Sequence, residues 1–158
     1  MPKIYLILDN IRSLHNVGSM FRTADAFGVS KIYLCGYTGR PIGRDGRPVK
    51  EIAKTALGAE KSVPWKHERH TWRVIEMLKK EGVRIVALEN NTPFRAVALT
   101  RFKPRFPVAV MLGNEVRGLS RPVLRRADAI VSIPMHGAKE SLNVSIACGI
   151  ALYALSNF

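Results

Sequence analysis

Apolar residues recur along this chain in short, continuous runs, each of the length of a β-strand. A continuous run, as opposed to an alternating one, is typical of a strand that is covered on both faces, as in a parallel sheet. We predict five such strands, at residues 4–8, 31–35, 83–88, 107–112 and 129–133.

Helical patterns lie between these runs. Residues 17–27 carry apolar side chains at the 3.6-residue spacing of a helix, with Asn16 placed to cap the start and Gly28 to end it. A second apolar stripe runs through residues 72–78 and is followed by Gly82. Strands that alternate with helices indicate an α/β fold, a parallel sheet flanked by helices and joined by right-handed crossovers.

The C-terminal segment combines an apolar helix with a polar beginning. Residues 146–158 are uncharged, and we predict that they form a fully buried helix. Its first turns carry Glu140, Ser141, Asn143 and Ser145, more polar groups than one cap requires. We expect Ser141 to cap the helix. Asn143 would then have amide donors and an acceptor left to position a polar ligand.

Charge narrows the range of partners. The 158 residues include 25 Lys and Arg against 12 Asp and Glu, a formal net charge of +13. Such an excess favours binding to a polyanion, above all nucleic acid, because phosphates relieve the repulsion between clustered cations. A basic protein with a merely charged surface is the alternative. With 47% hydrophobic residues the chain can also bury a sizeable core, which excludes a disordered chain.

One loop concentrates positive charge. Residues 36–51 include four glycines and two prolines, which disfavour regular structure there. Arginines are interleaved among them, at Arg40, Arg44 and Arg47. We predict that this loop contacts an RNA backbone, although a solvated surface loop would have the same composition.

Polar residues also gather where two predicted strands end. The first strand is followed by Asn10, Arg12, His15 and Asn16. The fourth is followed by Gly113, Asn114, Glu115, Arg117 and Gly118. Open α/β sheets bind ligands beyond the carboxyl ends of their strands, so both clusters are candidate binding residues. An asparagine cap beside an exposed arginine, and an ordinary strand-to-helix loop, are the structural alternatives.

Several kinds of site are not indicated. Cys35 and Cys148 lie in apolar contexts without a CxxC spacing, as expected of reduced core residues in a cytoplasmic protein. His67 and His70 lack further ligands nearby, so we predict no metal site. Neither GxGxxG, nor GxxxxGK[ST], nor GxSxG occurs. The apolar N-terminal run is short and ends at Asp9, which indicates a first strand, and we predict no membrane association.

Four segments taken together identify a family. "NVGSMFRTADAFG", "KTALGAE", "LGNEVRGLS" and "IPMHGAKESLNVSIACGIALY" occur in this order over almost the whole chain. The ordered set resembles the motifs of the SpoU-type (TrmH-like) branch of the SPOUT RNA methyltransferases. The resemblance implies a C-terminal deep trefoil knot in the parallel sheet and a homodimer. It also implies S-adenosyl-L-methionine as cofactor and methyl transfer to a ribose 2′-hydroxyl of tRNA or rRNA.

The same resemblance assigns roles to residues. Those implied to hold the cofactor are Leu88, Asn90, Gly113, Ile133, Ser141 and Leu142. Those matching the catalytic set are Arg22, Asn16, Glu115, Ser141 and Asn143. The arginines that we predict to bind RNA are Arg12, Arg40, Arg44, Arg47 and Arg117.

Two roles are open for Arg22. It could remove the proton of the 2′-hydroxyl, or it could bind a phosphate and stabilise the developing alkoxide. A guanidinium with a pKa above about 12 rarely gives up its proton, which favours the second role.

We expect a single domain over residues 1–158, with no separate RNA-binding domain. Recognition of the substrate would then depend on the catalytic surface, including the arginine-rich loop and residues 101–105, or on an accessory protein. A non-catalytic RNA-binding or assembly protein with the same fold is the alternative to an enzyme. The polar residues Arg22, Glu115, Ser141 and Asn143 favour the enzyme, because a simple RNA binder has no need for them.

Overall fold

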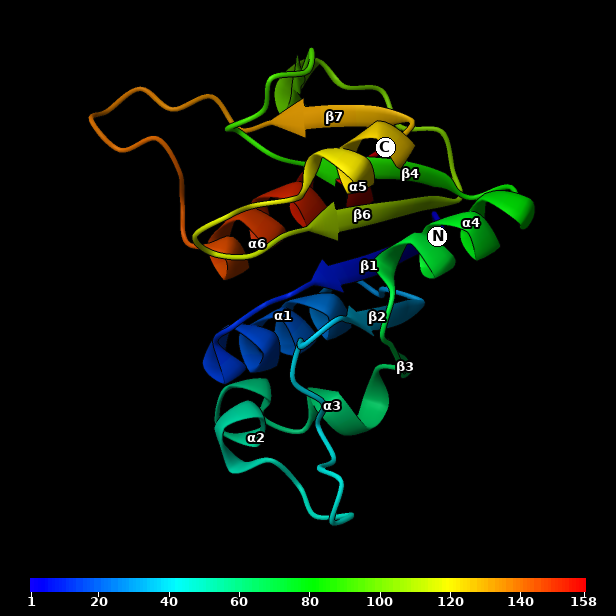
Figure 1. Ribbon diagram of the computed structural model, residues 1–158, viewed down its shortest axis with the longest axis vertical. Helices are drawn as coiled ribbons and strands as arrows, with labels where there is room; N and C mark the ends of the chain where they lie inside the picture. The colour runs from blue at the N-terminus through cyan, green and yellow to red at the C-terminus, as the bar shows by residue number, and fades with distance from the viewer.

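Seven parallel strands form one sheet in the order β3-β2-β1-β6-β4-β7-β5, in a computed structural model that describes residues 1–158 (Figure 1). The strands are β1 (Ile4–Asp9), β2 (Lys31–Cys35), β3 (Trp65–Glu68), β4 (Arg84–Leu88), β5 (Val97–Ala98), β6 (Val108–Leu112) and β7 (Ala129–Ser132). The prediction of a parallel α/β sheet is confirmed. The two strands that it missed, β3 and β5, are the short edge strands, whose half-exposed side chains form no continuous apolar run.

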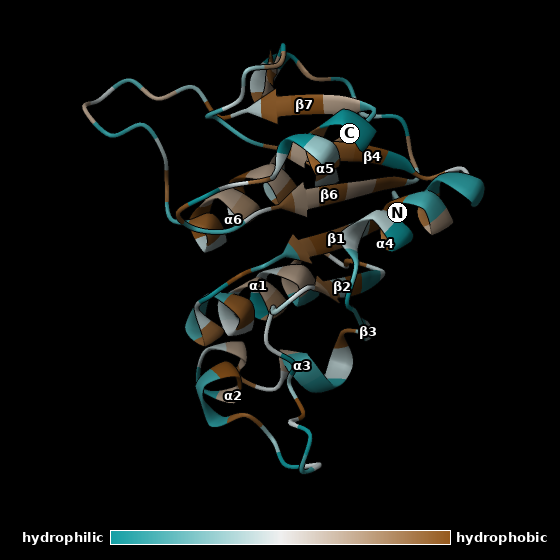
Figure 2. Ribbon diagram, in the orientation of Figure 1, coloured by the Kyte–Doolittle hydropathy of each residue, from teal (hydrophilic) through white to brown (hydrophobic).

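Helices cover both faces of the sheet. They are α1 (Leu14–Ala26), α2 (Lys50–Ala56), α3 (Ala59–Ser62), α4 (Thr71–Lys80), α5 (Arg121–Arg126) and α6 (Val144–Ser156), with a 3₁₀ turn at Leu99–Arg101. Strand β1 sends Ile4, Leu6 and Leu8 to the core on the α1 and α6 side, and Tyr5 and Ile7 to the core on the α4 and α5 side. Strand β1 therefore buries both of its faces from Ile4 to Leu8, and it is mostly brown in Figure 2.

Helix α1 begins earlier than its apolar pattern indicates. Ser13 is its N-cap, and the Ser13 side chain accepts a hydrogen bond of 3.1 Å from the backbone N–H of Asn16. The prediction that Asn16 caps the helix is therefore wrong, and its amide is left free for other contacts. The predicted end at Gly28 is confirmed, because Gly28 has φ of +63° directly after the C-cap residue Phe27.

Helix α6 differs from the prediction at both its start and its surface. Asn143, not Ser141, is the N-cap, and its Oδ1 accepts from the backbone N–H of Ser145 at 2.9 Å. The helix is also not fully buried. One side packs on α1, β6 and the 3₁₀ turn, whereas Ile146, Ile150 and Tyr153 on the helix are exposed.

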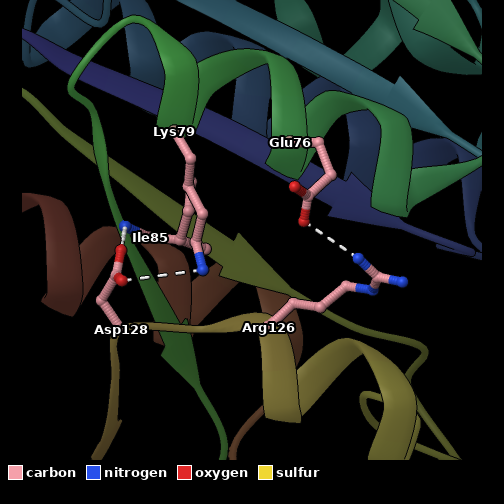
Figure 3. Close-up of polar contacts among 5 residues, drawn as sticks. All are labelled: Glu76, Lys79, Ile85, Arg126 and Asp128. Atoms are coloured by element: carbon pink, nitrogen blue, oxygen red, sulfur yellow. Dashed lines mark hydrogen bonds and ion pairs between the residues drawn. The ribbon is translucent and has the colours of Figure 1, made fainter.

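Two ion pairs join α4 to the α5–β7 region (Figure 3). Arg126 Nη1 lies 2.9 Å from Glu76 Oε1, and Lys79 Nζ lies 3.7 Å from Asp128 Oδ1. Asp128 Oδ2 also accepts a hydrogen bond of 2.7 Å from the backbone N–H of Ile85 in β4. The pairs are partly exposed, so each contributes only about 0–1 kcal/mol and serves mainly to orient α5 against α4.

The trefoil knot stays a prediction from the family resemblance. The segments that would form it are the loops after β6 and β7, which lie together beside the start of α6 (Figure 1). None of the helices is long and apolar enough to span a lipid bilayer.

Helices α1 and α2 lie so close at Gly18 that we expect a larger residue there to destabilise the protein. A Cβ at Gly18 would lie 2.3 Å from the carbonyl oxygen of Ile52 and 2.1 Å from Thr55 Oγ1. Gly18→Ala must therefore push the helices apart. We expect a net loss of about 1–2 kcal/mol in the free energy of unfolding, although alanine favours helix by about 1 kcal/mol. Urea denaturation measures the change.

Gly149→Ala in α6 is the matched control, because its Cβ would meet only Thr23 Cγ2 at 3.8 Å, an ordinary contact. This variant should be more stable than the wild type by about 0.5–1 kcal/mol. Equal effects of the two substitutions would contradict the packing argument.

Candidate functional site

A pocket lies at the carboxyl ends of β4, β6 and β7, where open α/β sheets bind ligands. Three loops meet there, at residues 88–91, 112–118 and 133–144. All six residues predicted to hold the cofactor line it: Leu88, Asn90, Gly113, Ile133, Ser141 and Leu142. So do the predicted catalytic residues Glu115 and Asn143. The structure thus brings together residues from three distant segments.

Asn90 holds the loop after β7 in place. Its Nδ2 donates to the carbonyl oxygen of Ile133 at 2.8 Å, and its Oδ1 accepts from the backbone N–H of Ile133 at 2.9 Å. Nδ2 also lies 3.4 Å from the carbonyl oxygen of Glu140. Because both ends of this amide are occupied by the backbone, Asn90 shapes the pocket wall.

Asn114 shapes the loop after β6. Its Oδ1 accepts from the backbone N–H groups of Val116 at 2.9 Å and Arg117 at 2.8 Å. Its Nδ2 donates to the carbonyl oxygen of Asn10 at 3.0 Å and to the Tyr37 hydroxyl at 2.7 Å. From the sequence, Asn114 belongs to a polar cluster and has no predicted role. A polar side chain that follows a buried strand after a single glycine is the signal that indicates one.

Close packing requires glycine at two points of this loop. A Cβ at Gly113 would lie 2.6 Å from the carbonyl carbon of Gly118. Gly118 has φ of +65°, and a Cβ there would lie 2.3 Å from Glu89 Oε2. That carboxylate oxygen accepts from the backbone N–H of Leu119 at 2.8 Å, so Glu89 is a second structural residue that the sequence analysis missed.

The carboxylate of Glu115 binds the beginning of α1. It accepts from the backbone N–H of Arg12 at 2.9 Å, from that of Ser13 at 3.0 Å and from Asn16 Nδ2 at 3.2 Å. Partial burial of Glu115 disfavours its charged form. The hydrogen bonds from Arg12, Ser13 and Asn16 outweigh this, so the pKa of Glu115 is lowered from its ordinary value.

A chain of amides continues from Glu115 to α6. Asn16 Oδ1 accepts from Asn143 Nδ2 at 3.2 Å, while Asn143 Oδ1 caps α6. Capping thus leaves the amide donors of Asn143 free, as predicted, and one of them binds Asn16. Its acceptor, which was also predicted to be free, is used for the cap. The network Glu115–Asn16–Asn143 joins the loop after β6, the start of α1 and the start of α6.

Other predicted residues lie outside this network. Arg22 is exposed on α1 and does not line the pocket, because six residues correspond to a rotation of about 240° from Asn16. Ser141 lines the pocket, but its hydroxyl makes no hydrogen bond within the chain. Arg12 contributes its backbone N–H, and its side chain is exposed. Arg117 is exposed at the pocket rim.

The arginine-rich loop is more ordered than its composition indicates. Ile42 and Pro48 form an antiparallel bridge, and the backbone N–H of Gly43 donates to the carbonyl oxygen of Arg47 at 2.8 Å. Arg44 and Arg47 are exposed, while Arg40 is half-buried. The loop lies near α2 and α3, at the other end of the sheet from β7 (Figure 1). These arginines are therefore not part of the pocket.

Residues 3–153 match the SpoU rRNA Methylase family. The chain belongs to this family. A curated relative from Coxiella burnetii, named 23S rRNA (guanosine-2'-O-)-methyltransferase RlmB, is 38% identical over 96% of this chain and 57% of its own length. The chain thus spans little more than half of that relative.

Solved structures with the same fold support the assignment. An AdoMet-bound rRNA methyltransferase from Sinorhizobium meliloti has a TM-score of 0.86 and 31% identity, over 98% of this chain and 56% of that one. A chain from work on 2-OH methylation of C/U34 on tRNA has a TM-score of 0.81 and 27% identity, over 96% of this chain and 93% of that one. This chain therefore resembles both a longer protein and one of similar length with the same fold.

The hydrogen bonds to Glu115 generate a prediction about pH. The pKa of Glu115 is lower in the folded state than the ordinary glutamate pKa of 4.5, so the ionised carboxylate stabilises the fold at pH values above 4.5. This stabilisation is lost as the pH falls through the lowered pKa of the folded state. Glu115→Gln should therefore unfold more easily than the wild type at pH 7. The difference in free energy of unfolding should shrink below about pH 4.5.

Urea denaturation between pH 3 and pH 7 measures this difference. Glu81→Gln, at an exposed glutamate after α4, serves as the control and should show a small difference that changes little with pH. If the free energies of unfolding of the wild type and Glu115→Gln differ by the same amount at every pH from 3 to 7, the assigned hydrogen bonds are refuted.

Proposed function

We propose that this SpoU domain is an S-adenosylmethionine-dependent methyltransferase that acts on a ribose 2′-hydroxyl of tRNA or rRNA. The observation that carries the proposal is the network Glu115–Asn16–Asn143 at the edge of the pocket. Its three polar side chains come from three of the family motifs, and packing of the core does not require polar groups at these positions. The relative from Coxiella burnetii, named as a 2′-O-methyltransferase, and the AdoMet-bound structure from Sinorhizobium meliloti support it.

The pocket has the chemistry to hold this cofactor. Its floor is apolar, formed by Leu88, Leu112, Ile133 and Ala147, which suits the adenine ring. Residues 134–142 make no backbone–backbone hydrogen bond, so most peptide groups of this loop are available to bind polar edges of a ligand. S-Adenosylmethionine supplies an electrophilic methyl group on a sulfonium sulfur.

The residues around the pocket would position the ribose. As the 2′-oxygen forms its bond to the methyl carbon, the methyl–sulfur bond breaks and the hydroxyl proton must leave. Asn143 and Asn16 hold each other in one orientation, and the Ser141 hydroxyl is free to bond a ribose oxygen. Rigid placement of this kind is the main source of rate in an in-line displacement.

The position of Arg22 supports a homodimer. Ile146, Ile150 and Tyr153 form an exposed apolar stripe on α6, with exposed fractions of 56%, 40% and 64%. Arg22 lies on α1, which packs on α6, and the neighbouring Thr23 faces Gly149 of that helix. A second copy that covers the stripe would therefore lie close to Arg22. We propose that Arg22 stabilises the developing alkoxide, or a neighbouring phosphate, at this dimer interface.

The remaining basic residues would bind the RNA backbone. The net charge of +13, the exposed Arg44 and Arg47, and Arg117 at the pocket rim support this role. An accessory protein could add recognition of the substrate. Free and buried Cys35 and Cys148 fit the reducing cytoplasm.

Transfer of labelled methyl groups tests the activity directly. Total tRNA and total rRNA from cells lacking the gene would be incubated with the protein and labelled S-adenosylmethionine, then digested to nucleosides. We expect label in a 2′-O-methylated nucleoside from one of the two pools. Absence of label in both pools, together with no cofactor binding by calorimetry, would favour the non-catalytic RNA-binding alternative.

Substitution of Arg22 tests its role. Arg22→Ala should lower turnover by about 100-fold or more, because a charge that stabilises the reacting oxygen is lost. Arg22→Lys should retain a measurable part of the rate, since it keeps the positive charge without the planar fork. Arg84→Ala, at the amino end of β4 and away from the pocket, is the control and should leave turnover near wild type.

The exposed stripe on α6 predicts the oligomeric state. Ile150→Asp should shift the protein from dimer to monomer in sedimentation velocity, because a buried charge at the interface would have no partner. Leu57→Asp, at an exposed leucine after α2, should leave the dimer intact. A wild-type protein that sediments as a monomer at micromolar concentration would rule out the dimer.

A further inference from the structure

A second cavity lies on the same edge of the sheet, beyond β1 and β2. Its volume is about 380 Å³, which falls in the range of small-ligand sites, roughly 300–1,000 Å³. The carboxyl ends of β1 and β2, the start of α4 and the loop after β6 surround it. Its lining combines aromatic, cationic and acidic side chains, among them Asp9, Tyr37, Arg69, Trp72 and Arg117.

The loop after β6 separates this cavity from the first pocket. Asn114, Arg117 and Gly118 line both of them. The floors differ, since Leu88, Leu112 and Ile133 lie under the first pocket and Asp9 lies under the second. A polynucleotide strand that enters one site can therefore reach the other across a single loop.

Aromatic rings are exposed at the second cavity. Tyr37 is 61% exposed and Trp72 is 46% exposed. The Tyr37 side chain is held by the bond from Asn114 Nδ2 to its hydroxyl, and its backbone N–H donates to Asn10 Oδ1 at 3.1 Å. Exposed rings that the surrounding structure holds in place are suited to stacking with a flat ligand.

Two guanidinium groups lie over the Trp72 ring. The guanidinium carbons of Arg73 and Arg126 lie 5.5 Å and 5.7 Å from its centre. Arg69 and Arg117, which line the cavity, have no carboxylate partner in the chain. An aromatic ring beside unpaired arginines is the combination with which proteins bind single-stranded nucleic acid, by stacking bases and neutralising phosphates.

The floor of the cavity offers hydrogen bonds to an edge of a base. Asp9 is almost fully buried, and its Oδ1 accepts a hydrogen bond from the Thr71 hydroxyl. Its other oxygen has no hydrogen-bond partner within the chain. It could accept from an amino or imino group of a base, whereas an ionised phosphate has no donor to offer it.

We propose that this cavity binds an unstacked base of the substrate RNA, next to the nucleotide whose ribose enters the first pocket. The base stacks on the Trp72 ring in place of one of the two guanidinium groups that lie over it, and turns its polar edge toward Asp9. Arg69 and Arg117 contact the flanking phosphates. Sequence-specific proteins commonly bind RNA through such splayed bases. The inference rests on the proposed function, because it takes RNA as the substrate.

Fluorescence of Trp72 tests the stacking without requiring catalysis. The chain has two tryptophans, so Trp65→Phe leaves Trp72 as the only one. This variant would be titrated with a mixed-sequence RNA hexanucleotide and with an abasic oligonucleotide of equal length and charge. We expect saturable quenching by the hexanucleotide and little by the abasic strand. Equal quenching by both, or none by either, would overturn the proposal.

Substitutions provide a second readout, the affinity for the same hexanucleotide by fluorescence anisotropy. Trp72→Ala should weaken binding about tenfold to a hundredfold, and Trp72→Phe should restore most of the affinity. Arg69→Gln should weaken binding more than Lys66→Gln, which removes the same charge from exposed β3 outside the cavity. Wild-type affinity in Trp72→Ala would overturn the proposal.

These outcomes are separate from those of the proposed function. If wild-type protein transfers methyl groups but Trp72 is not quenched, the second site fails and the enzyme remains. If Trp72 is quenched but cofactor binding and methyl transfer are both absent, the protein binds RNA bases and the proposed enzymatic function fails.

Discussion

The contact between the Glu115 carboxylate and the start of α1 holds the candidate site together. Two backbone N–H groups and the Asn16 amide converge on this carboxylate, from residues about 100 positions earlier in the chain. These N–H groups belong to the N-cap residue Ser13 and to Arg12 before it, next to the positive end of the helix, so a carboxylate there stabilises both the helix and the loop that carries it. This interaction sets the position of Asn16, and through it that of Asn143.

Helix caps have two functions in this protein. Ser13 caps α1, which frees the Asn16 side chain to bond Glu115 and Asn143. Asn143 caps α6 with its oxygen and bonds Asn16 with its nitrogen. The polar residues at the start of an apolar helix thus serve helix formation and the assembly of the site at once. Loss of either asparagine would leave an amide of the other without its partner.

Sheet order explains why two cavities lie side by side. Strands β1 and β6 are neighbours in the sheet although 99 positions separate Asp9, the end of β1, from Val108, the start of β6. The loop after β6 therefore lies between the ends of β1 and β4. That loop forms one wall of each cavity, and its shape depends on Asn114, Gly113 and Gly118. A single rigid loop therefore separates an apolar pocket suited to a cofactor from an aromatic and cationic cavity suited to a base.

The sequence alone determined the α/β fold, five of the seven strands and the family, because continuous apolar runs and local motifs are properties of neighbouring residues. It also identified six of the residues that line the first pocket, through the family resemblance. Only the tertiary structure decided the partners of Asn16 and Asn143, which lie 127 positions apart, and the exposed side of α6. It alone showed that Arg22 lies outside the pocket of its own chain and that Tyr37, Trp72 and Asp9 surround a second cavity. Contacts of this kind depend on the order of strands in the sheet and on helix rotation, and neither can be deduced from the spacing of residues within one segment.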